Sequence, residues 1–561
     1  MAAVRPPRRC VLVTVLLLAV AACTACTADP GPDRTATSDA GASATVTATG
    51  AGPTRAEGTA TPPADGPVTA PTVAGLPDAA AAVMATPPYA SGQWALSVRD
   101  LNTGEQVIDL NAHTLFQPGS VVKTYSTGAA WQEFGPGSTV VTPVKRTGEI
   151  VDGTLDGDLI LVGMGDLTLG GRTRPDGTVD FTDLDHNDAN GIPGATLTPE
   201  DPLTGLDDLA AQVRAAGVET VSGDVIVDDR LWEPHALENG PVSPIVVNQN
   251  VLDLTTTPAA VGEVAASELR PRVSPWAVES RVRTVAAGGS TAITVSSPDE
   301  RTVVLTGTIA ADSPPVVNIH AFADPARFAR TAFIEALQRA GVAVTTDPLA
   351  PNPGGDLPPV AAVTALAPVA ELTSLTFEQE ARYVLKISYN LGAETFVCRL
   401  AVAAGSTTCS DGLARAAGIW SAAGLDPKGA VLIDGSGLPG NLITADNQVE
   451  LQTIMASRPD AAAWRSAMPA LGVDGSLALV QKDSPARGKV VGKTGTLGAE
   501  DLFNQRFLLP SKALGGYIDT AGGRRFAFAV IATDSVFADI QGVFAANDDV
   551  GRVVAAIQQA Y

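Results

Sequence analysis

The sequence predicts an α/β (α+β) fold in which one mixed domain is interrupted by β-rich inserted domains. Within residues 76–146, a strand pattern at Trp94–Asp100 is followed by a helical pattern at Ser120–Trp131. The segment 147–316 then changes character, because it is rich in Val, Thr, Ile, Gly and Asp and holds short apolar runs between turn residues. Helical and strand patterns return in 317–561 and complete the interrupted domain.

Each expected element has a local signal. Trp94–Asp100 alternates in polarity and is followed by a turn at Asn102-Thr103-Gly104, whereas the helix of Ser120–Trp131 begins directly after a proline and a glycine. The other strands are expected from short apolar or alternating runs, and the other helices from a helical period. In chain order we expect strands at Leu159–Val162 and Asp224–Val227, helices at Asp324–Ala340, Phe377–Ala404 and Asp411–Ala423, strands at Lys489–Gly492, Lys512–Thr520 and Arg525–Thr533, and a helix at Asp549–Gln559.

Composition and charge exclude several classes of protein. Of the 561 residues, 45% are hydrophobic and 17% are charged, so the chain can bury sizeable cores and is not wholly disordered. The formal net charge of −23 argues against a basic face for nucleic acid. The four histidines have no metal-ligand spacing, so we expect no metal ion.

One acidic segment, Asp183–Gly191, resembles the start of a calcium-binding loop. However, Asp188 stands where the turn of an EF-hand needs glycine, and the bidentate glutamate is missing. The sequence therefore favours a solvated loop that holds no metal.

The N-terminal residues have the pattern of an export signal. Three arginines precede the apolar run Val11–Ala22, which is too short for a membrane span. We expect residues 1–22 to be a signal peptide and residues 23–75 to be a disordered stalk rich in Ala, Thr, Pro and Gly. The end of the run resembles a bacterial lipobox, so Cys23 is expected to carry lipid and to anchor the protein to the outer face of the cytoplasmic membrane. Ordinary cleavage near Ala25, without lipid, is the alternative.

Two cysteines lie in the expected folded body, Cys398 and Cys409, eleven residues apart. In an exported domain such a pair most simply forms a disulfide bond. Neither cysteine has a histidine nearby in the sequence, which makes a thiol nucleophile a poor alternative.

Two short motifs supply the groups of a serine nucleophile. Ser120 and Lys123 stand three residues apart at the start of a predicted helix, so their side chains share one helix face. A buried lysine with a lowered pKa can take the proton of a serine hydroxyl. Ser388 and Asn390, in the helical block, add a hydroxyl that can relay a proton and an amide that can bind a substrate carbonyl.

A third motif, Lys493-Thr494-Gly495-Thr496, follows a predicted strand. Its lysine and threonines can hold a carboxylate, and its glycine leaves room for a substrate backbone along the strand edge. Each of the three motifs occurs once in the chain, and they occur in the order that penicillin-recognising serine enzymes use.

On these motifs the chain resembles the penicillin-binding D-alanyl-D-alanine carboxypeptidases of the peptidase S13, or type-4 penicillin-binding protein, family. The resemblance covers about residues 76–561 and implies a penicillin-binding-protein/β-lactamase-like transpeptidase domain with a large insertion after the nucleophile. An extra segment, Glu500–Ser511, follows the third motif where the family runs straight into its next strand. Further similar stretches are Gly163–Leu169, Asp434–Leu438, Gly472–Leu477 and Leu514–Tyr517.

The resemblance implies that Ser120 attacks the bond between two terminal D-alanines of a peptidoglycan stem peptide and forms an acyl-enzyme. Lys123 is then the general base, Ser388 relays a proton to the leaving amine, and Asn390 orients the substrate. No cofactor is implied, and β-lactam antibiotics are expected to trap Ser120.

For recognition, the resemblance implies that Lys493, Thr494 and Thr496 hold the terminal carboxylate. The oxyanion is expected on the backbone amides of Ser120 and Thr496. Water then hydrolyses the ester.

Four other functions are alternatives to this one. An α/β-hydrolase needs Gly-x-Ser-x-Gly, and Ser436 lacks the leading glycine. A β-lactamase shares the three motifs but is usually a compact domain without a long insertion. A cell-wall scaffold without turnover, or an enzyme that acts mainly as a D,D-endopeptidase on cross-links, stays an alternative.

Overall fold

Residues 70–238, 240–299 and 301–561 are described by a computed structural model of the protein. The predicted signal peptide (1–22), the predicted lipid attachment at Cys23 and most of the predicted stalk (23–75) lie outside these residues. Within the described ranges, no helix is both long enough and apolar enough to span a bilayer.

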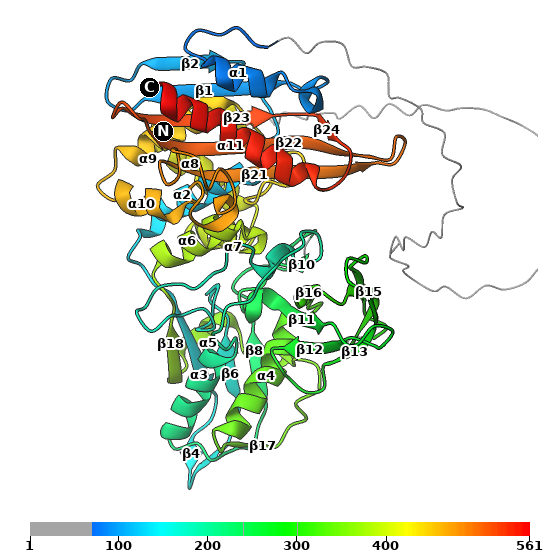
Figure 1. The fold of residues 1–561 in the computed structure, drawn as a ribbon. Coiled ribbons are helices and arrows are strands. Elements are labelled where there is room, and N and C mark those ends of the chain that lie inside the picture. The colour runs from blue at the N-terminus through cyan, green and yellow to red at the C-terminus, as the bar shows by residue number, and fades with distance from the viewer. Residues whose placement is uncertain (1–69, 239, 300) are drawn as a thin grey trace, which may run out of the picture. The chain divides into compact units, whose positions relative to one another are not determined.

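A six-stranded antiparallel sheet brings the first described strands next to the last ones (Figure 1). Its order is β2-β1-β23-β22-β21, with β24 paired to β22. Trp94 of β1 lies opposite Ala532 of β23, and Asp100 lies opposite Phe526, so the two strands pair along their whole length. The bounds are β1 Trp94–Asp100, β2 Gln106–Leu110, β21 Val490–Asp501, β22 Arg506–Asp519, β23 Arg525–Ala532 and β24 Ser535–Phe537.

Strand β23 shows why this sheet is covered on both faces. Its side chains alternate between the faces. Phe526, Phe528 and Val530 belong to the core cluster shared with α1 and α11, whereas Ala527 and Ala529 belong to the cluster shared with the other helices of the domain. Figure 1 shows α1 and α11 together on one side of the sheet. The helices are α1 Asp78–Met84, α2 Lys123–Phe134, α6 Phe377–Ile387, α7 Asn390–Ala403, α8 Asp411–Ala422, α9 Ala445–Ala456, α10 Ala461–Ala467 and α11 Gly542–Ala560.

The inserted segment contains several small sheets. One has the order β18-β3-β6-β8 and another the order β17-β7-β5-β4; two three-stranded sheets have the orders β12-β11-β16 and β13-β15-β14. The strands are β3 Val141–Arg146, β4 Ile150–Val151, β5 Thr154–Leu155, β6 Leu159–Val162, β7 Thr220–Val221, β8 Val225–Asp228, β11 Val251–Thr257, β12 Ala266–Arg270, β13 Ala277–Val285, β14 Ala292–Ser296, β15 Thr302–Ala310, β16 Val316–Ala321, β17 Ala343–Val344 and β18 Pro368–Thr373. Short pairs occur at β9 Ala236–Leu237 with β10 Gly240–Pro241, and at β19 Ala430–Val431 with β20 Leu442–Ile443.

The mixed helix and sheet fold predicted from the sequence is confirmed, with 30% helix and 27% strand. The predicted bounds of the insertion, 147–316, are too narrow, because β3 and β18 pair within one of its sheets. Helix α4 (Pro325–Arg339) also packs on α3 (Thr204–Ala215) and β8 of the insertion. A sequence pattern shows where elements begin and end, but only the pairing of distant strands shows which core they share.

Several helices are not among those expected from the sequence, including α3, α5 (Val360–Ala365), α9 and α10. Helix α3 lies inside the segment expected to be β-rich. Its Leu206, Leu209 and Val213 are buried at helical spacing, which is the signal that could have identified it.

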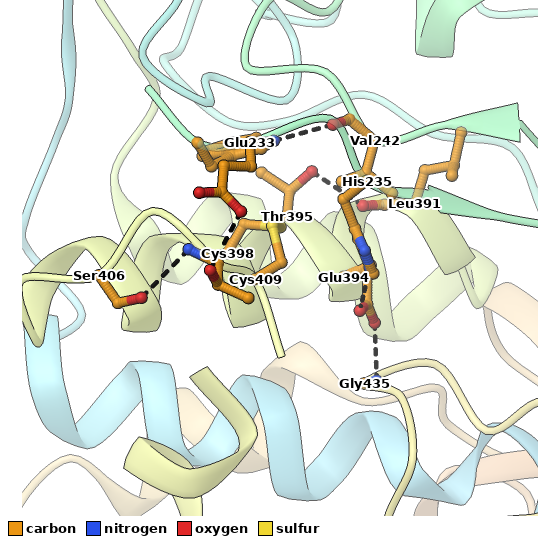
Figure 2. Close-up of a disulfide and its surroundings, with 12 residues drawn as sticks. Glu233, His235, Val242, Leu391, Glu394, Thr395, Cys398, Ser406, Cys409 and Gly435 are labelled. Atoms are coloured by element: carbon orange, nitrogen blue, oxygen red, sulfur yellow. Dashed lines mark hydrogen bonds and ion pairs between the residues drawn. A yellow bond between two sulfur atoms is a disulfide. The ribbon is translucent and has the colours of Figure 1, made fainter. Parts of the chain in front are cut away.

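Cys398 of α7 and Cys409, which precedes α8, form a disulfide bond, as the sequence analysis expects (Figure 2). One turn before Cys398, the carboxylate of Glu394 accepts a hydrogen bond from the backbone N–H of Gly435 at 2.7 Å. The same carboxylate lies 2.8 Å from Nε2 of His235, which belongs to the inserted segment. Helix α7 therefore connects the inserted segment with the loop at Gly435.

Candidate active site

Ser120 and Lys123 lie side by side at the start of helix α2. Ser120 belongs to a short 3-10 turn, Gly119–Val122, and Lys123 is the first residue of the helix that follows. The Lys123 Nζ donates a hydrogen bond to the Ser120 Oγ at 2.8 Å. The helical spacing read from the sequence thus produces the expected pair of side chains.

The amino group of Lys123 is buried and is held by three chain segments. Besides Ser120, it donates to the Oδ1 of Asn390 at 2.6 Å and to the backbone carbonyl of Ser436 at 2.7 Å. Burial lowers the pKa of Lys123 to about 7, although nearby carboxylates, that of Asp188 first among them, oppose the shift. Near neutral pH, a large fraction of this lysine is therefore the free amine that a general base requires.

Ser388 stands at the break between helices α6 and α7. Its backbone is left-handed, with φ 65° and ψ 38°, a conformation that costs a residue with a Cβ about 1–2 kcal/mol. The Nζ of Lys493 donates to the Ser388 Oγ at 2.9 Å and to the Thr494 carbonyl at 2.9 Å. Burial, together with the charges of Lys123 and Lys512, lowers the pKa of Lys493 well below its usual range.

Strand β21 contacts the nucleophile segment through two glycines. A Cβ on Gly495 would overlap the carbonyl oxygen of Pro118, and a Cβ on Gly119 would lie 2.7 Å from the amide nitrogen of Thr496. From the sequence, Gly495 is expected to leave room for a substrate backbone. In the structure that room is taken by the backbone before Ser120, so the glycine is required by the contact between strand and nucleophile.

The predicted residues meet at one cleft of about 630 Å³. Its lining includes Ser120, Ser388, Asn390, Thr494 and Thr496. Lys123 and Lys493 lie beneath this surface, since both are fully buried. All of the residues that the sequence analysis gave to nucleophile, proton transfer and carboxylate recognition are therefore neighbours in space.

The loop Asp434–Gly437 is a part of the site that the sequence analysis noted without a role. The Asp434 Oδ1 accepts the N–H groups of Ser436 at 2.7 Å and Gly437 at 2.6 Å, which fixes the loop. This geometry aims the Ser436 carbonyl at Lys123. A signal was present in the sequence, since Asp-Gly-Ser-Gly is a typical turn composition, but its partner was not predictable.

The acidic segment Asp183–Gly191 is only in part the solvated loop that the sequence favours, since Asp183, Asp188 and Asn190 are exposed whereas its middle is buried. Asp185 and His186 are buried, because the Arg172 guanidinium binds both oxygens of Asp185 at 2.8 and 2.9 Å. The Nδ1 of His186 lies 2.5 Å from the Oδ1 of Asp253. These contacts hold the segment against the cleft, which Asp183, Asp188 and their neighbours line. In the described part of the chain, no three His, Cys, Asp or Glu side chains are grouped to hold a metal ion.

The extra segment Glu500–Ser511 extends the hairpin of β21 and β22. Strand β24 pairs with the extension opposite Phe507, and Figure 1 shows this hairpin projecting beyond the rest of the sheet. Phe507 and Gly498 line the cleft, as do Ile540 and Phe544 near the start of α11. The segment thus contributes one apolar side chain, that of Phe507, to the lining of the cleft.

We predict that Gly437→Ala disrupts the site without unfolding the domain. A Cβ at this position would overlap the carbonyl oxygen of Gly119 and lie 2.9 Å from the Ser120 nitrogen, and φ is +95°. Displacement of the nucleophile by about 1 Å should slow acylation by a β-lactam about 100-fold. Stopped-flow labelling measures this rate.

The matched control is Gly418→Ala in helix α8, where an added Cβ meets no atom within 4 Å. This change should leave acylation unaltered and raise helix stability by up to about 1 kcal/mol. Equal acylation rates for the two variants would show that the contact at Gly437 does not position Ser120.

Comparison with known proteins agrees with this geometry. The model of the D-Ala-D-Ala carboxypeptidase 3 (S13) family matches residues 77–545. The chain is 30% identical over 482 residues to a D-alanyl-D-alanine carboxypeptidase of an Actinomadura species, a match that covers 80% of this chain and 79% of that protein.

The fold is similar to the crystal structure of penicillin binding protein 4 (dacB) from Haemophilus influenzae, with a TM-score of 0.60 and 17% identity over 82% of this chain and 95% of that one. A second crystal structure of that protein, complexed with a β-lactam, has the same TM-score at 18% identity and covers 83% of this chain and 96% of that one. The chain therefore belongs to the D-Ala-D-Ala carboxypeptidase 3 (S13) family.

Proposed function

We propose that the protein is a serine-type D-Ala-D-Ala carboxypeptidase that acts on peptidoglycan stem peptides through an acyl-enzyme on Ser120. The observation that carries the proposal is the hydrogen bond of 2.8 Å between the Ser120 hydroxyl, which lines the cleft, and the buried Lys123 amine. A serine is a weak nucleophile unless a base lies next to it. No histidine or carboxylate is needed for that task here.

Acylation begins when neutral Lys123 accepts the hydroxyl proton and the Ser120 Oγ forms a bond to the scissile carbonyl carbon. The carbonyl oxygen becomes an oxyanion. The close approach of Gly119 to the Thr496 nitrogen supports an oxyanion site formed by the N–H groups of Ser120 and Thr496. The start of helix α2 also favours negative charge at this point.

Breakdown of the tetrahedral species cleaves the amide C–N bond, and the leaving D-alanine amine needs a proton. Ser388, whose Oγ accepts a hydrogen bond from Lys493 at 2.9 Å, supplies it from its hydroxyl and is reprotonated by the proton that Lys123 took from Ser120, so that both side chains return to their starting states. The contact of Asn390 with Lys123 at 2.6 Å supports a role for Asn390 in orienting both base and substrate. Water then hydrolyses the ester and restores Ser120.

Recognition of the terminal carboxylate is assigned to the hydroxyls of Thr494 and Thr496, which line the cleft. The family resemblance implied that Lys493 also binds this carboxylate directly. Because Lys493 is buried and donates to Ser388 and to the Thr494 carbonyl, it positions these two residues of the cleft and does not itself reach the carboxylate.

The same groups fit a D,D-endopeptidase, because a cross-link also offers a D-alanyl carbonyl to Ser120. Release of free D-alanine from a pentapeptide supports the carboxypeptidase, and release of separated stem peptides from purified sacculi supports the endopeptidase. Acylation without either product supports the cell-wall scaffold that binds penicillin but has no turnover.

We predict that a fluorescent penicillin labels Ser120 alone. Ser120→Ala should abolish labelling, and Lys123→Ala should slow it about 10²–10⁴-fold, because that is the usual contribution of a general base. Mass mapping of the labelled peptide and labelling kinetics provide the measurements. Label on Ser388 or Ser436 would contradict the assigned roles.

We predict that the acylation rate rises with pH around the pKa of Lys123, which is about 7. The base is the deprotonated amine, so the first-order acylation rate at saturating penicillin is low below pH 6 and reaches a plateau above pH 8. Stopped-flow acylation from pH 5.5 to 9 measures the profile, with thermal unfolding followed over the same range as the control. A flat profile would exclude Lys123 as the titrating base.

The family places the action of the enzyme outside the cytoplasm, at the cell wall. We further propose that Cys23 carries a lipid that anchors the mature protein to the outer face of the membrane. The protein should then fractionate with membranes, and Cys23→Ser should release it. Unmodified Cys23 in soluble extracytoplasmic protein would contradict the anchor.

A further inference from the structure

Lys512 lies in the site and belongs to none of the three motifs. It stands on β22 directly opposite Thr496 of β21, and its Nζ donates a hydrogen bond to the Thr496 Oγ1 at 2.8 Å. The side chain lines the cleft although the residue is only 3% exposed. Lys512 therefore places an amino group next to a hydroxyl that faces the substrate.

The buried amino group of Lys512 has fewer hydrogen-bond acceptors and ion-pair partners than those of the other buried lysines in and near the site. The Lys123 Nζ donates to three acceptors and the Lys493 Nζ to two. Lys386 forms an ion pair with Asp474 at 2.6 Å. For Lys512, the described residues supply the Thr496 hydroxyl and no carboxylate within ion-pair distance.

A buried ammonium without an anion is costly, and burial lowers the pKa of Lys512 to about 7. An anionic ligand would remove that cost, because it supplies both the opposite charge and acceptors for the remaining N–H groups. The environment of Lys512 is thus incomplete until an anion enters the cleft.

The charges around the cleft also favour one orientation of a bound substrate. Of the described residues that line it, Lys512 is the one lysine or arginine, whereas Asp183 and Asp188 stand on the wall formed by the inserted segment. A substrate carboxylate is attracted to the first and repelled by the second. A peptide with a free C-terminus would therefore lie with that end toward β22.

We propose that Lys512 determines specificity by binding the C-terminal carboxylate of the substrate together with the hydroxyl of Thr496. The inference rests on the proposed function, since it names the group that selects the leaving residue at the same site. Lys512 does not take part in bond making or breaking.

The test compares a carboxylate ligand with its uncharged counterpart. Acylation by benzylpenicillin and by its methyl ester is measured for the full chain and for Lys512→Met. In Lys512→Met, loss of a charge-assisted hydrogen bond should lower the second-order rate constant of acylation by the acid about 10- to 100-fold. The rate constant for the ester should be unchanged. Lys512→Arg should retain most of the preference for the acid, and Lys428→Met, an exposed lysine outside the cleft, should retain all of it.

The outcomes separate the two proposals. If the Lys512→Met variant is acylated at Ser120 and still prefers the acid as strongly as the unsubstituted chain does, the inference is wrong and the proposed function stands. If the unsubstituted chain is not acylated at Ser120, the proposed function itself fails.

A second measurement does not depend on the folding of Lys512→Met. The Nζ resonance of Lys512 in protein with ¹⁵N-labelled lysine is identified as the one that Lys512→Arg removes. In Ser120→Ala protein labelled in the same way, binding of N-acetyl-D-alanyl-D-alanine should shift this resonance. The C-terminal amide of the same dipeptide should not shift it. Equal shifts for the acid and the amide would overturn the inference.

Discussion

The burial of one amino group, that of Lys123, is the constraint on which the site depends. Three acceptors from three separate segments surround it, the Ser120 hydroxyl, the Asn390 amide oxygen and the Ser436 carbonyl. Burial in low dielectric disfavours the ammonium, and these acceptors together with more distant carboxylates moderate the cost. The result is an amine near its midpoint at neutral pH that is positioned against the nucleophile.

The backbone around this lysine is held by contacts that exclude side chains. Gly119 lies against Thr496, and Gly495 lies against Pro118, so the turn that carries Ser120 is fixed on the edge strand of the sheet. Gly437 closes the turn from the other side. Such approaches are available to glycine alone, and they join residues separated by more than 300 positions in the sequence.

The inserted segment contributes to the site rather than standing apart from it. The Arg172–Asp185 and His186–Asp253 contacts hold its acidic loop at the cleft, and His235 reaches helix α7 through Glu394 (Figure 2). The buried Arg172–Asp185 ion pair is sensitive to geometry, because removing one partner leaves the other charge uncompensated in a low dielectric. These contacts hold the segment that carries Asp183 and Asp188 at the cleft that Lys512 also lines.

The sequence by itself determined the mixed fold, the family and the three short motifs, because the relevant signals are local. Ser120 and Lys123 share a helix face at a spacing of three residues, and alternation or helical period marked most of the elements that form the central sheet and the helical block.

Whatever depends on contacts between distant segments was decided only by the tertiary structure. The extent of the insertion follows from the pairing of β3 with β18, the direction of the Ser436 carbonyl from its contact with Lys123, and the placement of the acidic loop from a buried arginine. Lys512 reads in the sequence as one more polar residue in a strand. It becomes part of the site only because antiparallel pairing sets it opposite Thr496, and no local pattern encodes that register.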